Sequence, residues 1–205
     1  TSWPHLEDEL RRDLERVHRH AGPFDFVLCA GDLVQNGSRE ELDRLGARLD
    51  ALFAHLGELG SRPALLVVPG NHDLVRPDER DPVVRPLLHW SHDPELRANH
   101  FWHETSGKPY RDVIATAFGE LTAWLARWYE AHPLGDGWSR EGTGFMPGDF
   151  AATLRKDGIT LGLVGLNSAF LQLAPSMHRG GMAIHPHQLQ KLVGDPRAWT
   201  AQHDV

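Results

Sequence analysis

The stretch "LLVVPGNHDL", residues 65–74, decides the fold of this chain, because a run of aliphatic residues ends abruptly in Pro-Gly-Asn-His-Asp. The same change occurs in "FDFVLCAGDLVQNG", residues 24–37, where the apolar run ends at Gly31 and Asp32. Apolar runs without polar alternation are typical of strands buried on both faces. The two stretches therefore predict strands over 24–30 and 64–69, each followed by a polar loop.

The segment between these strands predicts an amphipathic helix. Ser38 and Glu41 have the spacing of a capping box, and a leucine-rich stripe continues to about Gly60. A strand, a helix and a second strand in this order form a right-handed parallel crossover. Both polar loops are then expected at the carboxyl edge of one sheet, where open α/β sheets bind their ligands.

The rest of the chain contains further periodic segments. Helical periodicity predicts helices over 4–20, 112–130 and 187–193. Residues 149–156 and 159–166 predict an antiparallel pair of strands joined by a turn at Lys156, Asp157 and Gly158. Residues 75–148 are rich in proline and turn residues, and we interpret them as a mostly helical insertion or lid. The sequence thus predicts one α/β domain over residues 1–205.

Composition and charge exclude several classes of function. The net charge is −7 and there is no long basic block, which leaves a nucleic-acid substrate open without favouring it. No apolar run approaches the roughly 20 residues of a membrane helix, so we expect no membrane span. The first ten residues do not resemble a signal peptide, and we expect a cytoplasmic location. The single cysteine, Cys29, lies in an apolar run and is expected to be a small buried side chain.

The residues at the two strand ends have the chemistry of a metal site. A carboxylate such as Asp32 can bridge two divalent cations, and the amide oxygen of Asn71 is a neutral ligand. His72 can donate a proton to a phosphate oxygen, and Asp73 can accept a hydrogen bond from the other nitrogen of that ring. Each motif alone is also explained by a polar turn, and their combination favours a shared site.

These two motifs together resemble the calcineurin-like metallophosphoesterase superfamily. The resemblance rests on Gly31, Asp32 and Gly37 in "GDLVQNG" and on residues 70–73, "GNHD", with a helix and a strand between them. It implies two mixed β-sheets packed as a sandwich and flanked by helices. It also implies hydrolysis of phosphate mono- or diesters at two divalent metal ions, such as manganese, iron or zinc, with a metal-bound hydroxide as the nucleophile.

The resemblance assigns roles to the matching positions. Asp32 and Asn71 are expected to be metal ligands, and His72 and Asp73 to be catalytic, with Asp73 acting behind His72. Independently of the resemblance, His178 and Arg179 lie in the loop after the predicted strand 159–166 and are expected to contact the substrate phosphate, because a guanidinium group suits a phosphate. The paired histidines of "HWSHD" and "HFWHE", residues 89–93 and 100–104, are expected to pack or lie at the surface.

The chain also departs from the superfamily pattern. An initial Asp-x-His and a later lone His and Gly-His-x-His are missing, and residues 201–205 resemble the beginning of a further strand. We therefore expect the domain to be incomplete at both ends and to form part of a larger polypeptide. The alternative is a catalytically degenerate domain with a regulatory or interaction role. A serine hydrolase is not favoured, because no Gly-x-Ser-x-Gly motif is present.

Overall fold

The computed structural model describes residues 3–142, 144–175 and 181–205. Its elements in chain order are α1 (Trp3–Ala21), β1 (Phe26–Cys29), α2 (Arg39–Glu58), β2 (Ala64–Val67), α3 (Val84–Leu88), η1 (Trp90–His92), η2 (Leu96–His100), α4 (Lys108–Ala117), α5 (Gly119–Ala131), β3 (Trp138–Glu141), β4 (Phe150–Lys156), β5 (Ile159–Gly165), α6 (Pro186–Val193) and α7 (Pro196–Thr200).

The strands form two sheets, which confirms the predicted α/β class. Strands β1 and β2 pair in parallel, and β3, β4 and β5 form an antiparallel sheet in that order. The predicted turn after β4 is confirmed, since Lys156 pairs with Ile159 across it. Strand β3 lies within 75–148, where the sequence predicted a mostly helical insertion and no strand, because four residues are too few to show a period.

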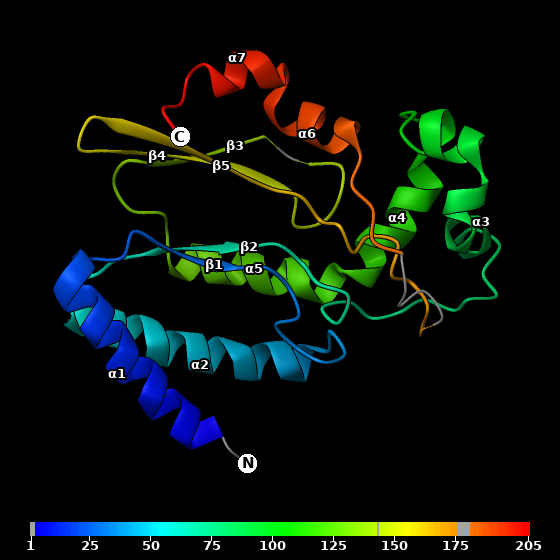
Figure 1. Cartoon of the computed structure of the whole chain (residues 1–205). Helices are drawn as coiled ribbons and strands as arrows, with labels where there is room; N and C mark the ends of the chain where they lie inside the picture. Colours follow the sequence, from blue (N-terminus) through cyan, green and yellow to red (C-terminus); the bar gives the residue numbers. More distant parts are fainter. Residues whose placement is uncertain (1–2, 143, 176–180) are drawn as a thin grey trace.

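The two sheets pack face to face through a small apolar cluster. Leu66 of β2 and Phe150 and Ala152 of β4 are buried at its centre, and Phe26 and Trp138 pack against them. Phe26 and Trp138 meet edge to face, with ring centroids 6.0 Å apart. This contact confirms the predicted sandwich, and Figure 1 shows α6 and α7 above the antiparallel sheet and α2 below the parallel one.

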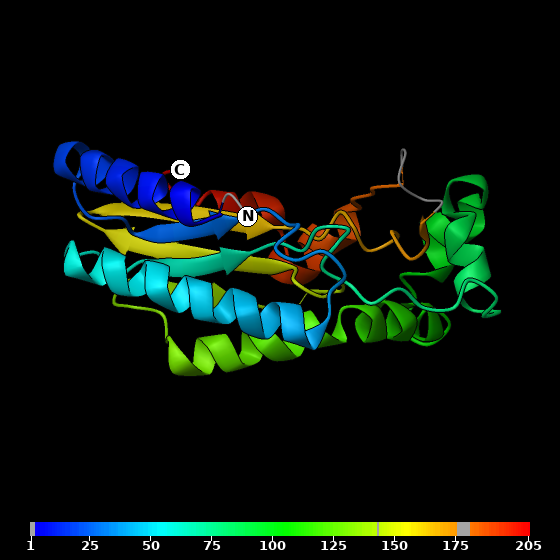
Figure 2. The same cartoon turned by 90° about the horizontal axis from the view of Figure 1, so that it is seen from below.

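A larger core lies on the other face of the parallel sheet. It joins Leu65 and Val67 of β2 to α2, α5 and the helices near residues 84–118. Figure 2 shows α2 and α5 side by side beneath the strands. The predicted insertion, 75–148, therefore has two parts: α5 and β3 belong to the sandwich layers, and the segment from α3 to α4 projects beyond the strand ends (Figure 1).

Most helices agree with the sequence, and two details differ. The predicted helix over 112–130 is two helices, because Phe118 lies between the end of α4 at Ala117 and the beginning of α5 at Gly119. Ser38 does cap α2 by accepting from the backbone of Glu41, but the Glu41 carboxylate accepts from the backbone of Asn36, so the reciprocal half of the capping box is missing.

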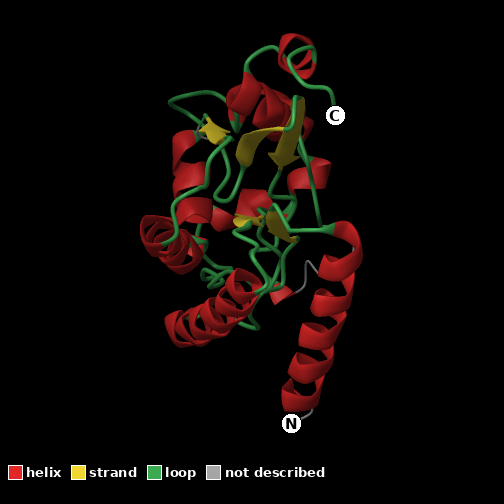
Figure 3. Ribbon diagram, turned by 90° about the vertical axis from the view of Figure 1, so that its left-hand side faces the viewer, coloured by secondary structure: helices red, strands yellow, loops and turns green. Residues whose placement is uncertain are grey.

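The two strands of the parallel sheet differ in burial. All four residues of β2 are buried, as predicted. In β1, however, Leu28 is 52% exposed, so the prediction that both faces are buried is wrong for this strand. β1 is an edge strand, and α1 runs away from the sheets toward the N-terminus (Figure 3). At the other end of the chain, Gly162 donates to the carbonyl of Val205, so the last residues run beside β5.

The described helices include none that is both long and apolar enough to cross a membrane.

Candidate metal centre

The loops that follow β1 and β2 meet at one edge of the sheet and come unusually close. A Cβ atom on Gly31 would lie 2.7 Å from the Cα of Gly70, and one on Gly70 would lie 2.3 Å from the backbone nitrogen of Asp32. Gly31 also has a φ of 101°, which disfavours any other residue. The close approach of the two backbones thus explains why glycine occupies positions 31 and 70.

The Asp32 carboxylate lies against the second loop. Its Oδ1 accepts a hydrogen bond from the backbone nitrogen of His72 at 3.2 Å, although the two residues are 40 positions apart. Asp32 is exposed and has a φ of 54°, in the left-handed region that residues other than glycine seldom occupy. Such backbone strain gathers at functional sites, where the surrounding structure enforces it.

The side chain of Asp73 connects the two loops by hydrogen bonds. Its side chain is fully buried, Oδ1 accepts from the backbone nitrogen of Val34 at 3.0 Å, and Oδ2 accepts from that of Gly70 at 2.8 Å. Burial raises the pKa of this carboxyl above its usual value despite these hydrogen bonds, and the charge of Asp32 adds to the effect. Both oxygens are therefore occupied by backbone donors.

The predicted hydrogen bond from the His72 ring to Asp73 is wrong, because Gln35 takes that place. Nδ1 of His72 lies 2.9 Å from the backbone carbonyl of Gln35 and 3.1 Å from its side-chain nitrogen. A carbonyl oxygen can only accept and an amide nitrogen can only donate, so the two contacts require opposite states of Nδ1. In the closer contact, to the carbonyl, Nδ1 carries the hydrogen and Nε2 remains for a proton exchange. No sequence pattern indicates that Gln35 contacts the His72 ring, because the closer contact is made by a backbone carbonyl, which every residue has.

Asn71 is oriented by a residue that sequence reasoning also missed. Nη2 of Arg76 donates to the backbone carbonyl of Asn71 at 3.0 Å. Within the described parts of the chain, the side-chain amide of Asn71 has no hydrogen-bond partner, so its oxygen remains available as a ligand. Arg76 lies five residues after Asn71, which is the only local cue to this contact.

The donors at this edge fit part of the coordination of a divalent cation. The carboxylate of Asp32 and the amide of Asn71 are oxygen ligands of the type that hard or borderline ions prefer. Over residues 3–142, 144–175 and 181–205, however, no three histidine, cysteine, aspartate or glutamate residues gather closely enough to hold an ion by themselves. The predicted ligands account for one side of such a site.

The remaining predicted residues lie elsewhere. His178 and Arg179 fall outside the described residues. Trp90 and Trp102 are buried and pack against each other. His92, His100 and His103 are exposed, in line with the surface position expected for the paired histidines. Cys29 is half-buried against the larger core, and burial raises the pKa of its thiol.

Comparison with known proteins agrees with this geometry. The family model for calcineurin-like phosphoesterases matches residues 4–165, which include both loops and the strands that precede them. The searches of curated proteins and of solved structures returned no match. The match covers well over half of the chain, and the chain belongs to the calcineurin-like phosphoesterase family.

Proposed function

We propose that this chain hydrolyses phosphate mono- or diesters at the edge where the loops after β1 and β2 meet, using two divalent ions such as manganese, iron or zinc. The observation that supports the proposal best is the hydrogen bond from the His72 backbone to Asp32. It brings a carboxylate, an amide and an imidazole from two distant motifs to one place. The negative net charge favours a small phosphate ester over duplex nucleic acid.

In this proposal the chain's own residues bind the ions and move a proton. Asp32 and Asn71 hold the ions, which when bound neutralise charge on the phosphate and lower the pKa of water. Gln35 fixes the His72 ring by accepting from Nδ1, and the ring in its imidazolium form, with both nitrogens protonated, delivers the Nε2 proton to the leaving oxygen and is left as the neutral imidazole. Asp73 positions both loops through Gly70 and Val34 rather than touching the substrate.

The test uses the full-length protein with manganese and two substrates, p-nitrophenyl phosphate and its bis ester. Asp32→Asn is expected to weaken manganese binding and to lower kcat/KM at least about a hundredfold, because an amide replaces a charged ligand. His72→Ala is expected to lower kcat by about a hundredfold or more while manganese binding is kept. Calorimetric titration with manganese separates the two effects.

The control is Asp8→Asn, which changes an exposed carboxylate on α1 and is expected to leave both readouts unaltered. If Asp32→Asn hydrolyses both substrates as fast as the wild type, Asp32 is not a metal ligand of the active site.

The second candidate is a degenerate domain with a regulatory or interaction role. It is favoured by one observation, the lack of three clustered metal-binding side chains among the described residues. This function predicts that the full-length protein neither binds manganese tightly nor cleaves either substrate, whereas the enzyme does both.

A further inference from the structure

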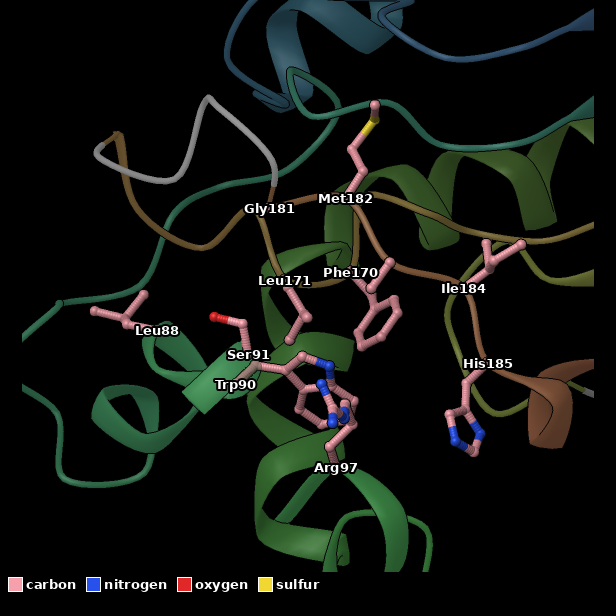
Figure 4. A pocket seen from close by; sticks show the side chains of 11 residues that line it. Leu88, Trp90, Ser91, Arg97, Phe170, Leu171, Gly181, Met182, Ile184 and His185 are labelled. Atoms are coloured by element: carbon pink, nitrogen blue, oxygen red, sulfur yellow. The ribbon is translucent and has the colours of Figure 1, made fainter. Parts of the chain in front are cut away.

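A pocket separate from the strand-end loops opens between the projecting helices and the segment that leads to α6. It has a volume of about 260 Å³ and lies between η1 and η2 on one side and residues 181–185 on the other (Figure 4). Its lining residues are Leu88, Trp90, Ser91, Arg97, Phe170, Leu171, Gly181, Met182, Ala183, Ile184 and His185. Neither Asp32 nor any residue from 70 to 73 lines it.

Arg97 gives this pocket an unpaired positive charge. Arg97 is an exposed residue, and within the described ranges no residue forms an ion pair or hydrogen bond with its guanidinium group. The nearest acidic residues in the sequence are engaged elsewhere: Asp93 accepts from the backbone of Leu96 at 2.9 Å, and Glu95 accepts from Asn99. Figure 4 shows the Arg97 side chain directed toward Trp90 and Phe170.

The backbone around Arg97 is also unusual. Residues Leu96–His100 form a single turn of π-helix, closed by a hydrogen bond from the Phe101 nitrogen to the Leu96 carbonyl at 3.0 Å. Such wide turns are rare, and they occur frequently at functional sites. Trp102, just after this turn, donates its indole hydrogen to the Arg97 carbonyl at 2.9 Å, which fixes the base of the side chain.

The rest of the pocket is apolar. Trp90 and Phe170 are buried and pack edge to face at 5.8 Å, forming an aromatic floor. At the rim, Met182 and Ile184 are 70% and 67% exposed, which is high for large apolar side chains. A ligand with an apolar body would contact this floor and cover the rim, and burial of that surface is favourable.

His185 limits the charge that the pocket carries. Its ring stacks on Trp102 with a centroid distance of 4.5 Å. Burial, together with the nearby His187 and Arg97, lowers the pKa of this imidazole, which favours its neutral form. Among the described residues that line the pocket, Arg97 is then the one side chain with a permanent positive charge, which fits a ligand with a single negative charge.

From this arrangement we propose that the pocket is a binding site for a small aromatic carboxylate, distinct from the phosphoesterase site. Arg97 binds the carboxylate, as guanidinium groups do in a two-pronged geometry, and Trp90 and Phe170 lie against the ring. The volume of about 260 Å³ lies just below the range of pockets that take drug-sized ligands, which fits a small ligand. Benzoate has the matching size, charge and shape.

The test is a titration of the full-length protein with benzoate, followed by saturation-transfer NMR or calorimetry in the presence of a chelator. The chelator keeps the metal centre from contributing. Benzyl alcohol, which has a similar shape and no charge, is expected to bind at least tenfold more weakly. Arg97→Ala is expected to raise the dissociation constant for benzoate at least tenfold, and Arg97→Lys to raise it less.

Two matched variants locate the binding. Arg85→Ala removes an exposed arginine of α3 outside the pocket and is expected to leave the dissociation constant unchanged, as is Asp32→Asn at the strand-end loops. Circular dichroism confirms that each variant is folded. Equal affinity for benzoate and benzyl alcohol, undetectable benzoate binding, or a loss of binding in Asp32→Asn but not in Arg97→Ala would each overturn the proposal.

Discussion

At the scale of single residues, Asp73 shows how one buried carboxylate fixes the geometry of two loops. It accepts one backbone hydrogen bond from the loop after β1, at Val34, and one from the loop after β2, at Gly70. Both donors would be left without a partner inside the protein if this carboxylate were removed. The cost of a buried unsatisfied donor is about 1–3 kcal/mol.

The variant Asp73→Asn is expected to lower the free energy of unfolding by about 1–3 kcal/mol, because its amide can accept from one backbone nitrogen but turns a hydrogen toward the other. Asp78→Asn is the matched control, since Asp78 is exposed and its single bond from the Arg80 backbone can be kept by an asparagine. Urea unfolding of both variants measures the difference. Equal stability of the two variants would show that Asp73 does not join the loops.

At the scale of elements, α2 contains two glycines in different surroundings. A Cβ atom on Gly57 would meet nothing within 4 Å, whereas one on Gly46 would lie 3.1 Å from the indole nitrogen of Trp124 on α5. Gly46 therefore marks the place where α2 and α5 approach closely, and Gly57 lies on the open side of the helix. A substitution at Gly57 therefore reports on helix propensity alone, and one at Gly46 reports on helix propensity and packing together.

Gly57→Ala is expected to stabilise the protein by about 0.5–1 kcal/mol, because alanine loses less backbone entropy in a helix than glycine does. In Gly46→Ala the same gain is opposed by the contact with Trp124, so this variant is expected to be less stable than Gly57→Ala by about 1 kcal/mol. Thermal unfolding of both variants provides the comparison. A larger gain at Gly46 would show that α2 and α5 adjust freely.

At the scale of the whole molecule, Asp149 joins the loop before β4 and the loop after β5 to α6. Its carboxylate accepts from the backbone nitrogens of Met146 and Asn167 and from the side chain of Gln188 at 3.0, 2.8 and 3.1 Å. Burial raises the pKa of Asp149 from 3.8 to about 6, and these hydrogen bonds oppose the effect without cancelling it. The neighbouring Gly148 lies against Pro69, so this junction supports the loop after β2.

The raised pKa of Asp149 predicts a pH dependence of stability. The folded protein holds this proton more tightly than the unfolded chain, so the contribution of Asp149 is full below pH 3.8 and is lost as the pH rises through about 6. The loss is at most about 3 kcal/mol, at 1.36 kcal/mol per pH unit. Asp149→Asn has no carboxyl group to titrate at this position. Because only the wild type loses stability through Asp149 as the pH rises, the stability of Asp149→Asn relative to the wild type is expected to rise between pH 4 and pH 7.

Urea unfolding across this pH range measures the change, with Asp136→Asn as a control at an exposed position. The comparison uses the slope with pH, because the lost hydrogen bonds lower the stability of Asp149→Asn at every pH. Identical slopes for the wild type and Asp149→Asn would contradict the raised pKa.

The local sequence was sufficient for features that depend on near neighbours. The strands around Val27 and Leu66, the N-cap at Ser38, the turn after Lys156 and the apolar stripe of α5 were all predicted, because each depends on residues a few positions apart. The parallel pairing of β1 and β2 followed from the helix that connects them. Together these local features are enough to place Asp32 and Asn71 at one edge of the sheet.

Contacts between distant segments were decided by the tertiary structure. The partners of Asp73 and of the His72 ring, the exposure of Leu28, the short strand β3 and the pocket around Arg97 all depend on segments far apart in the chain. A carboxylate or an imidazole can form hydrogen bonds with many donors and acceptors, and only packing selects among them. The sequence by itself thus determined which chemical groups stand at the strand ends, and the tertiary structure decided which of them meet.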